Sequence, residues 1–447
     1  MRRDAAVEYL RGSLWAVPSV VAAFAVLLGF VLSRLPVDVH SMLAFQGTAD
    51  DARALLIGIA STMVTVIALL LGLAVVALQL SSTQYSPRLL RNFLRDRPNQ
   101  VVLGIFVGTF VYSAAGLFTV GVFGGDRVED FPRLAVSVAV VLLFVSLALL
   151  VYFADHLAHS IQVDRIMRVA ERNALCVVAD TRAAGAVAPA PPPWAVAVAS
   201  ESSGYLQKVD LGGLAEAAAR HGLSGVRVVP RVGDHVVRGT PLAWVWTDTD
   251  DAAGTAVRDG PRLVRHAVRL GIERTFEQDP GLGVRQLVDI GCKALSPAIN
   301  DPYTAIQAID HLAVIFSTMA TAPGGDRVAH DTSGRVTASI RQRSFAQHLA
   351  LGCGLLRRYG AREPTLVTAL LRMLVTCAYL GPPSAMAVIE EQAAQVVMAA
   401  ELAELLPPDL ATVHKHAERL RRAVADRRAD SVGPPADVPA PTPAERS

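Results

Sequence analysis

The sequence predicts a membrane α-helical protein with four transmembrane helices, followed by a small cytoplasmic β domain and a cytoplasmic helical domain. Three observations lead to this fold class. The first third of the chain carries long apolar stretches, a linker rich in Pro and Ala then leads into short β-type runs, and helical periodicity returns from residue 261.

The four apolar stretches cover residues 17–32, 55–80, 101–123 and 134–154. A helix needs about 20 predominantly apolar residues to cross the bilayer core. The first stretch is a little short and the second is long, so tilt or extension beyond the lipid is expected. No stretch carries an ionisable residue at its centre. Because such residues usually mark proton relays or coupled-ion sites, the sequence argues against a pump driven by protons or sodium ions.

Charged residues alternate between the segments that flank these stretches. Arginines precede the first stretch, lie between the second and third, and follow the fourth, whereas the other two loops carry mainly acidic residues. Lys and Arg collect on the cytoplasmic side of membrane proteins. We therefore expect a multi-pass protein of the bacterial inner membrane with both termini in the cytoplasm. The first stretch does not fit a cleaved secretory signal.

Composition limits the expected partners. The 447 residues contain 42 Lys and Arg against 40 Asp and Glu, so no large basic surface favours nucleic acid. The four cysteines are widely separated and fall in the part predicted to be cytoplasmic, without the spacing of a metal or redox site. We expect no bound metal and no cofactor.

A helix is expected over residues 164–179, followed by the Pro/Ala linker at 183–194. Short β-type runs with glycine turns fill residues 195–250. Within them, residues 231–245 resemble the hairpin of biotinyl/lipoyl-like barrel-sandwich hybrid domains. The carrier lysine of those domains is missing, so we expect a structural β domain without an attached cofactor.

The rest of the chain predicts seven helices and one hairpin. The helices are expected at 261–270, 284–295, 302–319, 340–359, 363–380, 383–406 and 408–428, and the hairpin at 327–337. The expected domains are 1–160 (transmembrane), 161–194 (helix and linker), 195–250 (β), 251–428 (helical) and 429–447 (a disordered Pro-rich tail).

The second apolar stretch carries a polar stripe along one side. Its small and hydroxyl residues fall within an arc of about 100° at helical spacing. They either let helices pack closely and share hydrogen bonds or line a water-filled path through an oligomer. The candidate residues are Gly58, Ser61, Thr62, Thr65, Gly72 and Gln79.

A basic amphipathic helix is expected next, with Ser86 as its N-cap and Pro87 in its first turn. Its basic face either anchors the protein at the inner leaflet or contacts an anion or the anionic headgroup of a lipid. The candidate contact residues are Arg88, Arg91, Arg95 and Arg97.

A polar corner is expected between the helices at 284–295 and 302–319. Ser296-Pro297 ends the first helix, and Asn300 or Asp301 caps the second, which starts at Pro302. The corner is either a capped turn, which is the default interpretation, or a site for a small polar ligand or a metal. Its candidate residues are Arg285, Asp289, Ser296, Asn300, Asp301 and Thr304.

Segments 51–60, 79–97, 104–112 and 294–305 together resemble the bacterial predicted membrane proteins of domain-of-unknown-function family 2254, and residues 203–207 fit the same pattern. The resemblance covers roughly residues 10–420. Lys293 departs from it, because arginine is more usual there. The resemblance implies the membrane topology and a cytoplasmic C-terminal region. It implies no activity and no catalytic residue.

The function expected from these observations is an oligomeric passive channel or channel-like transporter regulated by its cytoplasmic domain. It would contact membrane lipids, including anionic headgroups, and assemble as a homo-oligomer. The alternative is a membrane-anchored sensor or scaffold that binds a small polar ligand or a protein partner. A membrane enzyme that uses Asp279, Asp289 and Asp301 is a third hypothesis, disfavoured because no nucleophile elbow or phosphate-binding glycine loop is present.

Overall fold

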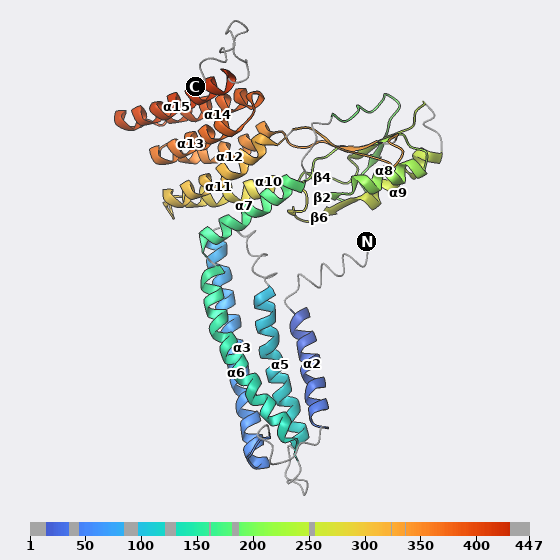
Figure 1. Cartoon of the computed structure of the whole chain (residues 1–447), viewed down its shortest axis with the longest axis vertical. Coiled ribbons are helices and arrows are strands. Elements are labelled where there is room, and N and C mark those ends of the chain that lie inside the picture. The colour runs from blue at the N-terminus through green and yellow to red at the C-terminus, as the bar shows by residue number, and fades with distance from the viewer. Residues whose placement is uncertain are drawn as a thin grey trace, which may run out of the picture. The chain divides into compact units, whose positions relative to one another are not determined.

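A computed structural model describes residues 15–34, 44–84, 97–120, 131–160, 162–180, 187–249, 255–322, 324–335 and 337–429. The chain forms two compact units, Met1–Arg165 and Ile166–Ser447, which we call the membrane unit and the C-terminal unit. Figure 1 shows the elements of both units in chain order. The predicted tail lies outside the described residues from residue 430 onward.

Four helices are described in the membrane unit: α2 (Ala16–Leu32), α3 (Ala49–Gln84), α5 (Arg97–Val120) and α6 (Arg133–Ser160). Three of the described helices have segments long and apolar enough to cross a membrane, at Ala49–Val76, Arg97–Val120 and Arg133–Leu157. α2 is apolar but has only 17 residues. The structure therefore supports a mostly helical membrane protein with three candidate spans, and the fourth predicted span is not confirmed.

α3 begins six residues before the predicted apolar stretch because Thr48 and Asp51 stabilise its first turn. The Thr48 backbone N–H and hydroxyl both donate to Asp51 Oδ2, at 2.9 and 2.7 Å, and the Asp51 N–H donates to Thr48 Oγ1 at 3.2 Å. This reciprocal arrangement satisfies donors that a helix start otherwise leaves unpaired.

α5 packs against α2, α3 and α6. Two glycines of α5 let α2 approach it. A Cβ added at Gly104 or Gly108 would lie 3.2 or 3.0 Å from Val21 side-chain atoms, so a larger residue would push α2 away. The contact between α5 and α3 buries Leu56, Ile59 and other apolar residues of α3.

The C-terminal unit contains two small sheets (Figure 1). The larger has the strand order β1 (Val196–Ala199), β5 (Pro241–Trp246), β3 (Gly225–Val228), β8 (Thr337–Ile340), β7 (Arg327–His330). The smaller has the order β4 (His235–Val236), β2 (Gly204–Val209), β6 (Val268–Gly271). All neighbours are antiparallel except β3 and β8, which pair in parallel from Gly225↔Thr337 to Val228↔Ile340. Three strands thus come from beyond residue 250: β7 and β8, where the sequence predicted a hairpin, and β6, which it did not predict.

The helices of this unit are α7 (Val163–Asp180), which starts in the membrane unit, α8 (Leu211–Arg220), α9 (Thr255–Ala267), α10 (Gly281–Ala294), α11 (Pro302–Thr321), α12 (Phe345–Gly360), α13 (Pro364–Leu380), α14 (Met386–Glu401) and α15 (Pro407–Ala429). α8 and α9 cover the apolar core of the sheets, which includes Leu214, Val226 and Val264. The predicted hairpin is confirmed by β7 and β8, with Gly334 at a positive φ of 70° in its turn.

Three predicted helix boundaries are wrong. Residues 268–270 continue as β6 because they pair with β2, a long-range contact that local periodicity does not reveal. The helix predicted from 340 starts at Phe345, where Ser344 and Gln347 form a capping box. The helix predicted over 383–406 consists of a short 3-10 turn, Pro383–Ala385, and α14.

Candidate functional site

The polar stripe of α3 faces away from the other described helices of the membrane unit. Gly58, Ser61, Thr62, Thr65, Gly72 and Gln79 are all exposed, whereas the opposite face of α3 is buried against the bundle. A Cβ added at Gly58 or Gly72 would meet no atom within 4 Å. Packing against the described helices of the membrane unit therefore does not account for the stripe.

Two hydroxyls of this stripe are bonded within α3 itself. Thr62 Oγ1 donates to the Gly58 carbonyl at 2.8 Å, and Thr65 Oγ1 donates to the Ser61 carbonyl at 3.2 Å. Such bonds to the preceding turn make a hydroxyl tolerable in an apolar medium. The stripe is thus compatible with either a helix partner or water.

Polar residues of α5 have the opposite orientation and hold the bundle together. Thr109 Oγ1 lies 3.0 Å from Ser146 Oγ of α6, and both side chains are buried. The Tyr112 hydroxyl donates to the Ala135 carbonyl of α6 at 2.9 Å. The outer face of α6 is apolar, with Phe144, Leu147 and Val151 exposed. A lipid-facing surface is expected to have this composition.

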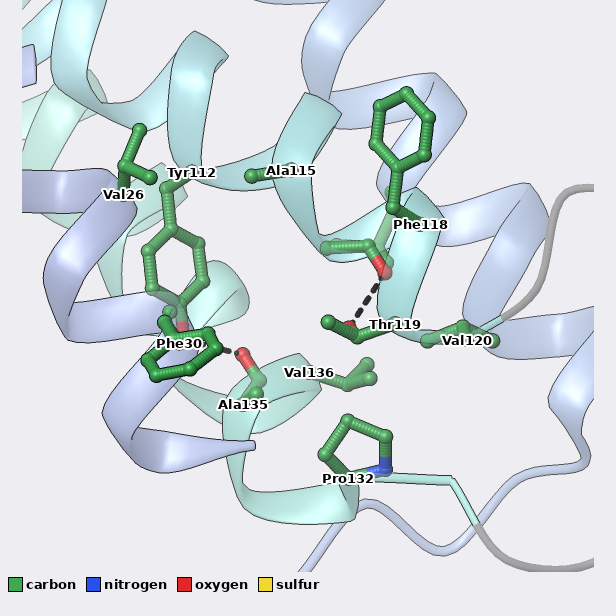
Figure 2. Close-up of a pocket in the computed structure, with 13 residues that line it drawn as sticks. Val26, Phe30, Tyr112, Ala115, Phe118, Thr119, Val120, Pro132, Ala135 and Val136 are labelled. Atoms are coloured by element: carbon green, nitrogen blue, oxygen red, sulfur yellow. Dashed lines mark hydrogen bonds between the residues drawn. The ribbon is translucent and has the colours of Figure 1, made fainter. Parts of the chain in front are cut away.

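A small apolar pocket of about 180 Å³ lies among the membrane helices (Figure 2). Figure 2 shows Val26, Phe30 and Phe118 at its wall and the Tyr112 hydroxyl pointing to the Ala135 carbonyl. Thr119 donates to the Gly116 carbonyl at 2.8 Å. Because both polar groups are bonded, the pocket offers apolar surface only and suits a hydrocarbon chain better than a polar solute.

Of the predicted basic helix, Arg88, Arg91 and Arg95 lie outside the described residues, and Arg97 is the first residue of α5. The predicted contact with an anion or a lipid headgroup therefore stays a prediction.

The predicted polar corner forms the start of α11. Asp301 is the N-cap, and its carboxylate accepts from the Thr304 N–H at 3.1 Å and from the Thr304 hydroxyl at 2.6 Å. These bonds lower the pKa of Asp301. Asn300 takes a positive φ of 50°, and the Ser296 hydroxyl donates to the Lys293 carbonyl at 2.7 Å. The structure thus brings Asp301 and Thr304 together as a cap, while Arg285 and Asp289 lie on α10.

A different cluster of charged groups lies where the smaller sheet, the β7–β8 hairpin and the start of α10 meet. Asp279 is 2% exposed and accepts from Arg274 Nε at 2.7 Å, and Arg343 Nη1 lies 3.7 Å from its other oxygen. Arg343 Nη2 also donates to Asp234 Oδ1 at 2.5 Å. A buried carboxylate is stable only when paired in this way.

Three further arginines surround this core, and no described carboxylate forms an ion pair with them. Arg231, Arg327 and Arg341 line a cavity of about 60 Å³ together with Asp279, Arg343 and His348, and we call this cavity the arginine pocket. Arg327 Nη1 and Arg274 Nη2 are buried without a hydrogen-bond partner. Burial lowers the pKa of Arg327. Five guanidinium groups therefore face two carboxylates.

His348 of α12 lines the arginine pocket and is 6% exposed. Burial, followed by the charges of Arg343, Arg274 and Arg231, lowers its pKa to about 4. The imidazole is thus neutral at pH 7, and its buried Nδ1 has no hydrogen-bond partner among the described residues. A buried ring nitrogen without a partner costs free energy unless a bound group completes it.

A larger pocket of about 310 Å³ lies beside the arginine pocket, and we call it the adjoining pocket. Both share Pro280, Gln342, Arg343 and His348 as lining residues. The rest of the adjoining pocket is mostly apolar, with Met319, Phe345, Pro382 and Val388 among its lining residues.

Sequence reasoning missed most of this site. It named Asp279 only in the disfavoured enzyme hypothesis, and none of the six proposed corner residues lines either pocket. Arg327, the first residue of β7, and Arg343, in the loop after β8, lie about 50 and 70 residues beyond Arg274 and belong to no recognisable motif. One signal available in the sequence was the Gly233-Asp234 turn. In the structure this turn lies against the cluster, because a Cβ at Gly233 would lie 2.3 Å from Asp279 Oδ2.

Comparison with known proteins gives a family match over most of the chain. Residues 11–376 match a family described as predicted membrane proteins, DUF2254. Uncharacterized proteins of Mycobacterium bovis and Mycobacterium tuberculosis are 42% identical to this chain over 446 residues, which cover 97% of this chain and 84% of each relative. No solved structure matches.

Proposed function

The chain belongs to the DUF2254 family of predicted membrane proteins, and on this premise we propose that it forms a passive channel or channel-like transporter in the bacterial inner membrane. Several copies assemble so that the polar faces of their α3 helices line a shared path. The supporting observation is the outward orientation of Ser61, Thr62 and Thr65 in a helix of spanning length.

The faces of neighbouring helices strengthen this choice. A single chain leaves two kinds of surface outward: on α3 the polar stripe lies beside exposed Ile57, Val64 and Leu69, and on α6 the outer face is apolar. Lipid suits the second better than the first, whose threonine hydroxyls it tolerates because they bond the preceding turn. Water or another copy of α3 is the natural partner for the stripe, and the absence of ionisable residues from the centres of the apolar stretches favours passive movement over coupling to ions.

In this proposal α2 is the fourth span and both termini are cytoplasmic. α2 packs along α5 through Gly104 and Gly108, and its 17 residues extend about 25 Å, slightly less than the bilayer core of roughly 30 Å. The arginines that precede α5 contact anionic headgroups at the inner leaflet.

Protease-cleavable tags at each terminus, tested on inverted and right-side-out vesicles, check the orientation. Cleavage of either tag from the outside would refute it.

Cysteine labelling tests the path directly. In a chain whose four native cysteines are replaced, Ser61→Cys and Thr65→Cys should react with a charged, membrane-impermeant thiol reagent. Val145→Cys, at a similar depth on the outer face of α6, serves as the matched control and should stay unlabelled. Equal protection of all three cysteines would exclude a water-filled path.

Oligomeric state separates a path from mere packing between copies. Native mass spectrometry of the full chain in nanodiscs should show a closed assembly of several copies, and liposomes should show solute flux that Ser61→Leu combined with Thr65→Leu abolishes. A monomer, or an oligomer without flux, would contradict the channel.

A membrane-anchored sensor is the second candidate, and the arginine pocket favours it. The pocket contains buried polar groups without partners, and none of them belongs to the membrane unit. A sensor predicts ligand binding with no flux, so the same liposome assay distinguishes the two candidates.

A further inference from the structure

We propose that the arginine pocket binds the phosphate of a small organic phosphate ester, whose less polar body occupies the adjoining pocket. This site does not depend on the path through the membrane, because every residue that forms it lies in the C-terminal unit.

The charge of the pocket selects an anion. Arg274 and Arg343 are bound to Asp279 and Asp234, whereas Arg231, Arg327 and Arg341 have no carboxylate partner in the described part of the chain. Asp279 repels an anion less than its position suggests, because Arg274 contacts it at 2.7 Å. Guanidinium groups bind phosphate oxygens with paired, charge-assisted hydrogen bonds.

The start of α10 adds a second donor group to the same place. Its N-cap is Pro280, which makes no side-chain capping bond. A Cβ built on Gly281 would lie 3.2 Å from Asp279 Oδ1, 3.2 Å from His348 Cε1 and 3.3 Å from Arg343 Nη1, so the helix start lies against these two side chains and the paired carboxylate. The first N–H groups of a helix and its dipole favour a multiply charged anion such as phosphate.

His348 shows that the pocket is built for a bound polar group. Its imidazole is buried, neutral and without a partner at Nδ1, and it lines both pockets. A neutral histidine bonds a phosphate ester through one ring N–H without adding a charge. At the junction of the two pockets it would contact the phosphate or the atom that joins it to the body.

The adjoining pocket defines the rest of the ligand. Its volume of about 310 Å³ and its lining by Met319, Phe345 and Val388 suit a ring system or short apolar body, not a free inorganic ion. The ligand class is therefore an organic phosphate ester, for which ADP, pyrophosphate and adenosine are suitable probes of the whole molecule, the anionic part and the body.

Calorimetric titration of the full chain in phosphatidylcholine nanodiscs tests this site. ADP should bind more tightly than pyrophosphate, and adenosine should bind weakly. Arg327→Met should weaken ADP binding by about tenfold to a hundredfold, because a hydrogen bond to a charged group is lost. Its unfolding temperature without ligand should not fall, because Arg327 forms no ion pair with a described carboxylate and its buried Nη1 has no hydrogen-bond partner among the described residues.

Arg421→Met is the matched control, since it removes the same charge from an exposed position on α15. It should leave ADP affinity unchanged. Arg341→Met repeats the test at an exposed pocket residue in case Arg327→Met does not fold. Absence of binding by ADP and pyrophosphate at millimolar concentration, or equal affinity in the pocket variants and Arg421→Met, would overturn the proposal.

A phosphate ester could be soluble or part of a lipid. Nanodiscs that contain phosphatidate separate the two sources. Unchanged ADP binding in them assigns the site to a soluble ester, whereas competition assigns it to a phospholipid headgroup. Because these titrations contain no flux measurement, their failure is independent of the failure of the channel.

Discussion

The two units of this protein place polar side chains in opposite ways. In the membrane unit, the stripe of α3 faces outward, while the buried hydroxyls of Thr109 and Tyr112 bond α6. In the C-terminal unit, charged groups face inward, and Arg327 Nη1 and His348 Nδ1 are buried without a hydrogen-bond partner among the described residues. The difference teaches where each unit is incomplete. In our proposals, another copy of the chain completes the membrane unit, and a bound phosphate ester completes the C-terminal unit.

The largest expected effect concerns the buried ion pair of the C-terminal unit. Asp279→Asn leaves Arg274, with an 11% exposed side chain, near the centre of a positive cluster. We expect the unfolding free energy of this unit to fall by roughly 3–5 kcal/mol. Urea unfolding followed by tryptophan fluorescence measures it. Asp310→Asn, which breaks an exposed pair with Arg372, is the control and should cost about 0–1 kcal/mol. Similar losses would mean that Asp279 is not an internal counter-charge.

The second prediction concerns pH and tests the enclosed histidine. The pKa of His348 is about 4 in the folded chain, below its ordinary value of 6.5. Between these two pH values the unfolded chain therefore binds more protons at this histidine than the folded chain does. Stability from this group is fully present above pH 6.5 and falls as the pH drops toward 4, by roughly 3 kcal/mol in total. His348→Gln should remove this part of the pH dependence, and the exposed His266→Gln should not. Identical pH profiles for wild type and His348→Gln would refute a buried neutral imidazole.

The third prediction separates backbone strain from crowding at the pocket wall. Gly233 and Gly239 have nearly equal φ values of 87° and 88°, but a Cβ would contact Asp279 only at Gly233 and would meet nothing within 4 Å at Gly239. Gly239→Ala should cost roughly 1–2 kcal/mol from strain alone. Gly233→Ala should cost more and should also weaken ADP binding. Equal costs, measured by urea unfolding, would show that Asp279 moves freely.

The smallest expected effect tests the membrane unit. Thr109→Val removes a buried hydroxyl contact between α5 and α6 and should cost about 0.6 kcal/mol in bundle stability. Thr62→Val alters the outward face of α3, where the hydroxyl bonds only its own helix, and should cost nothing measurable in a single chain. Unfolding in mixed micelles compares the two. A larger loss for Thr62→Val would mean that copies of the protein associate through this face.

Local signals predicted much of the fold. The apolar stretches, the cap at Asp301 and the hairpin turn at Gly334 depend on residues close in sequence, and they are where the sequence placed them. β6 and the parallel pairing of β3 with β8 depend on distant partners, so periodicity did not reveal them. The arginine pocket belongs to this second class. Its charged groups come from four separate segments of the chain, and only folding brings them together.

The parallel pairing of β3 with β8 also affects how the chain folds during synthesis. β3 pairs with β5 soon after residue 246 has been made, but its other edge has no partner until residues 337–340 emerge. A strand edge that stays open in this way readily pairs with other chains. A ribosome-bound chain that ends at residue 250 should therefore be prone to aggregate and to be bound by chaperones, and one that reaches Ile340 should be protected from both.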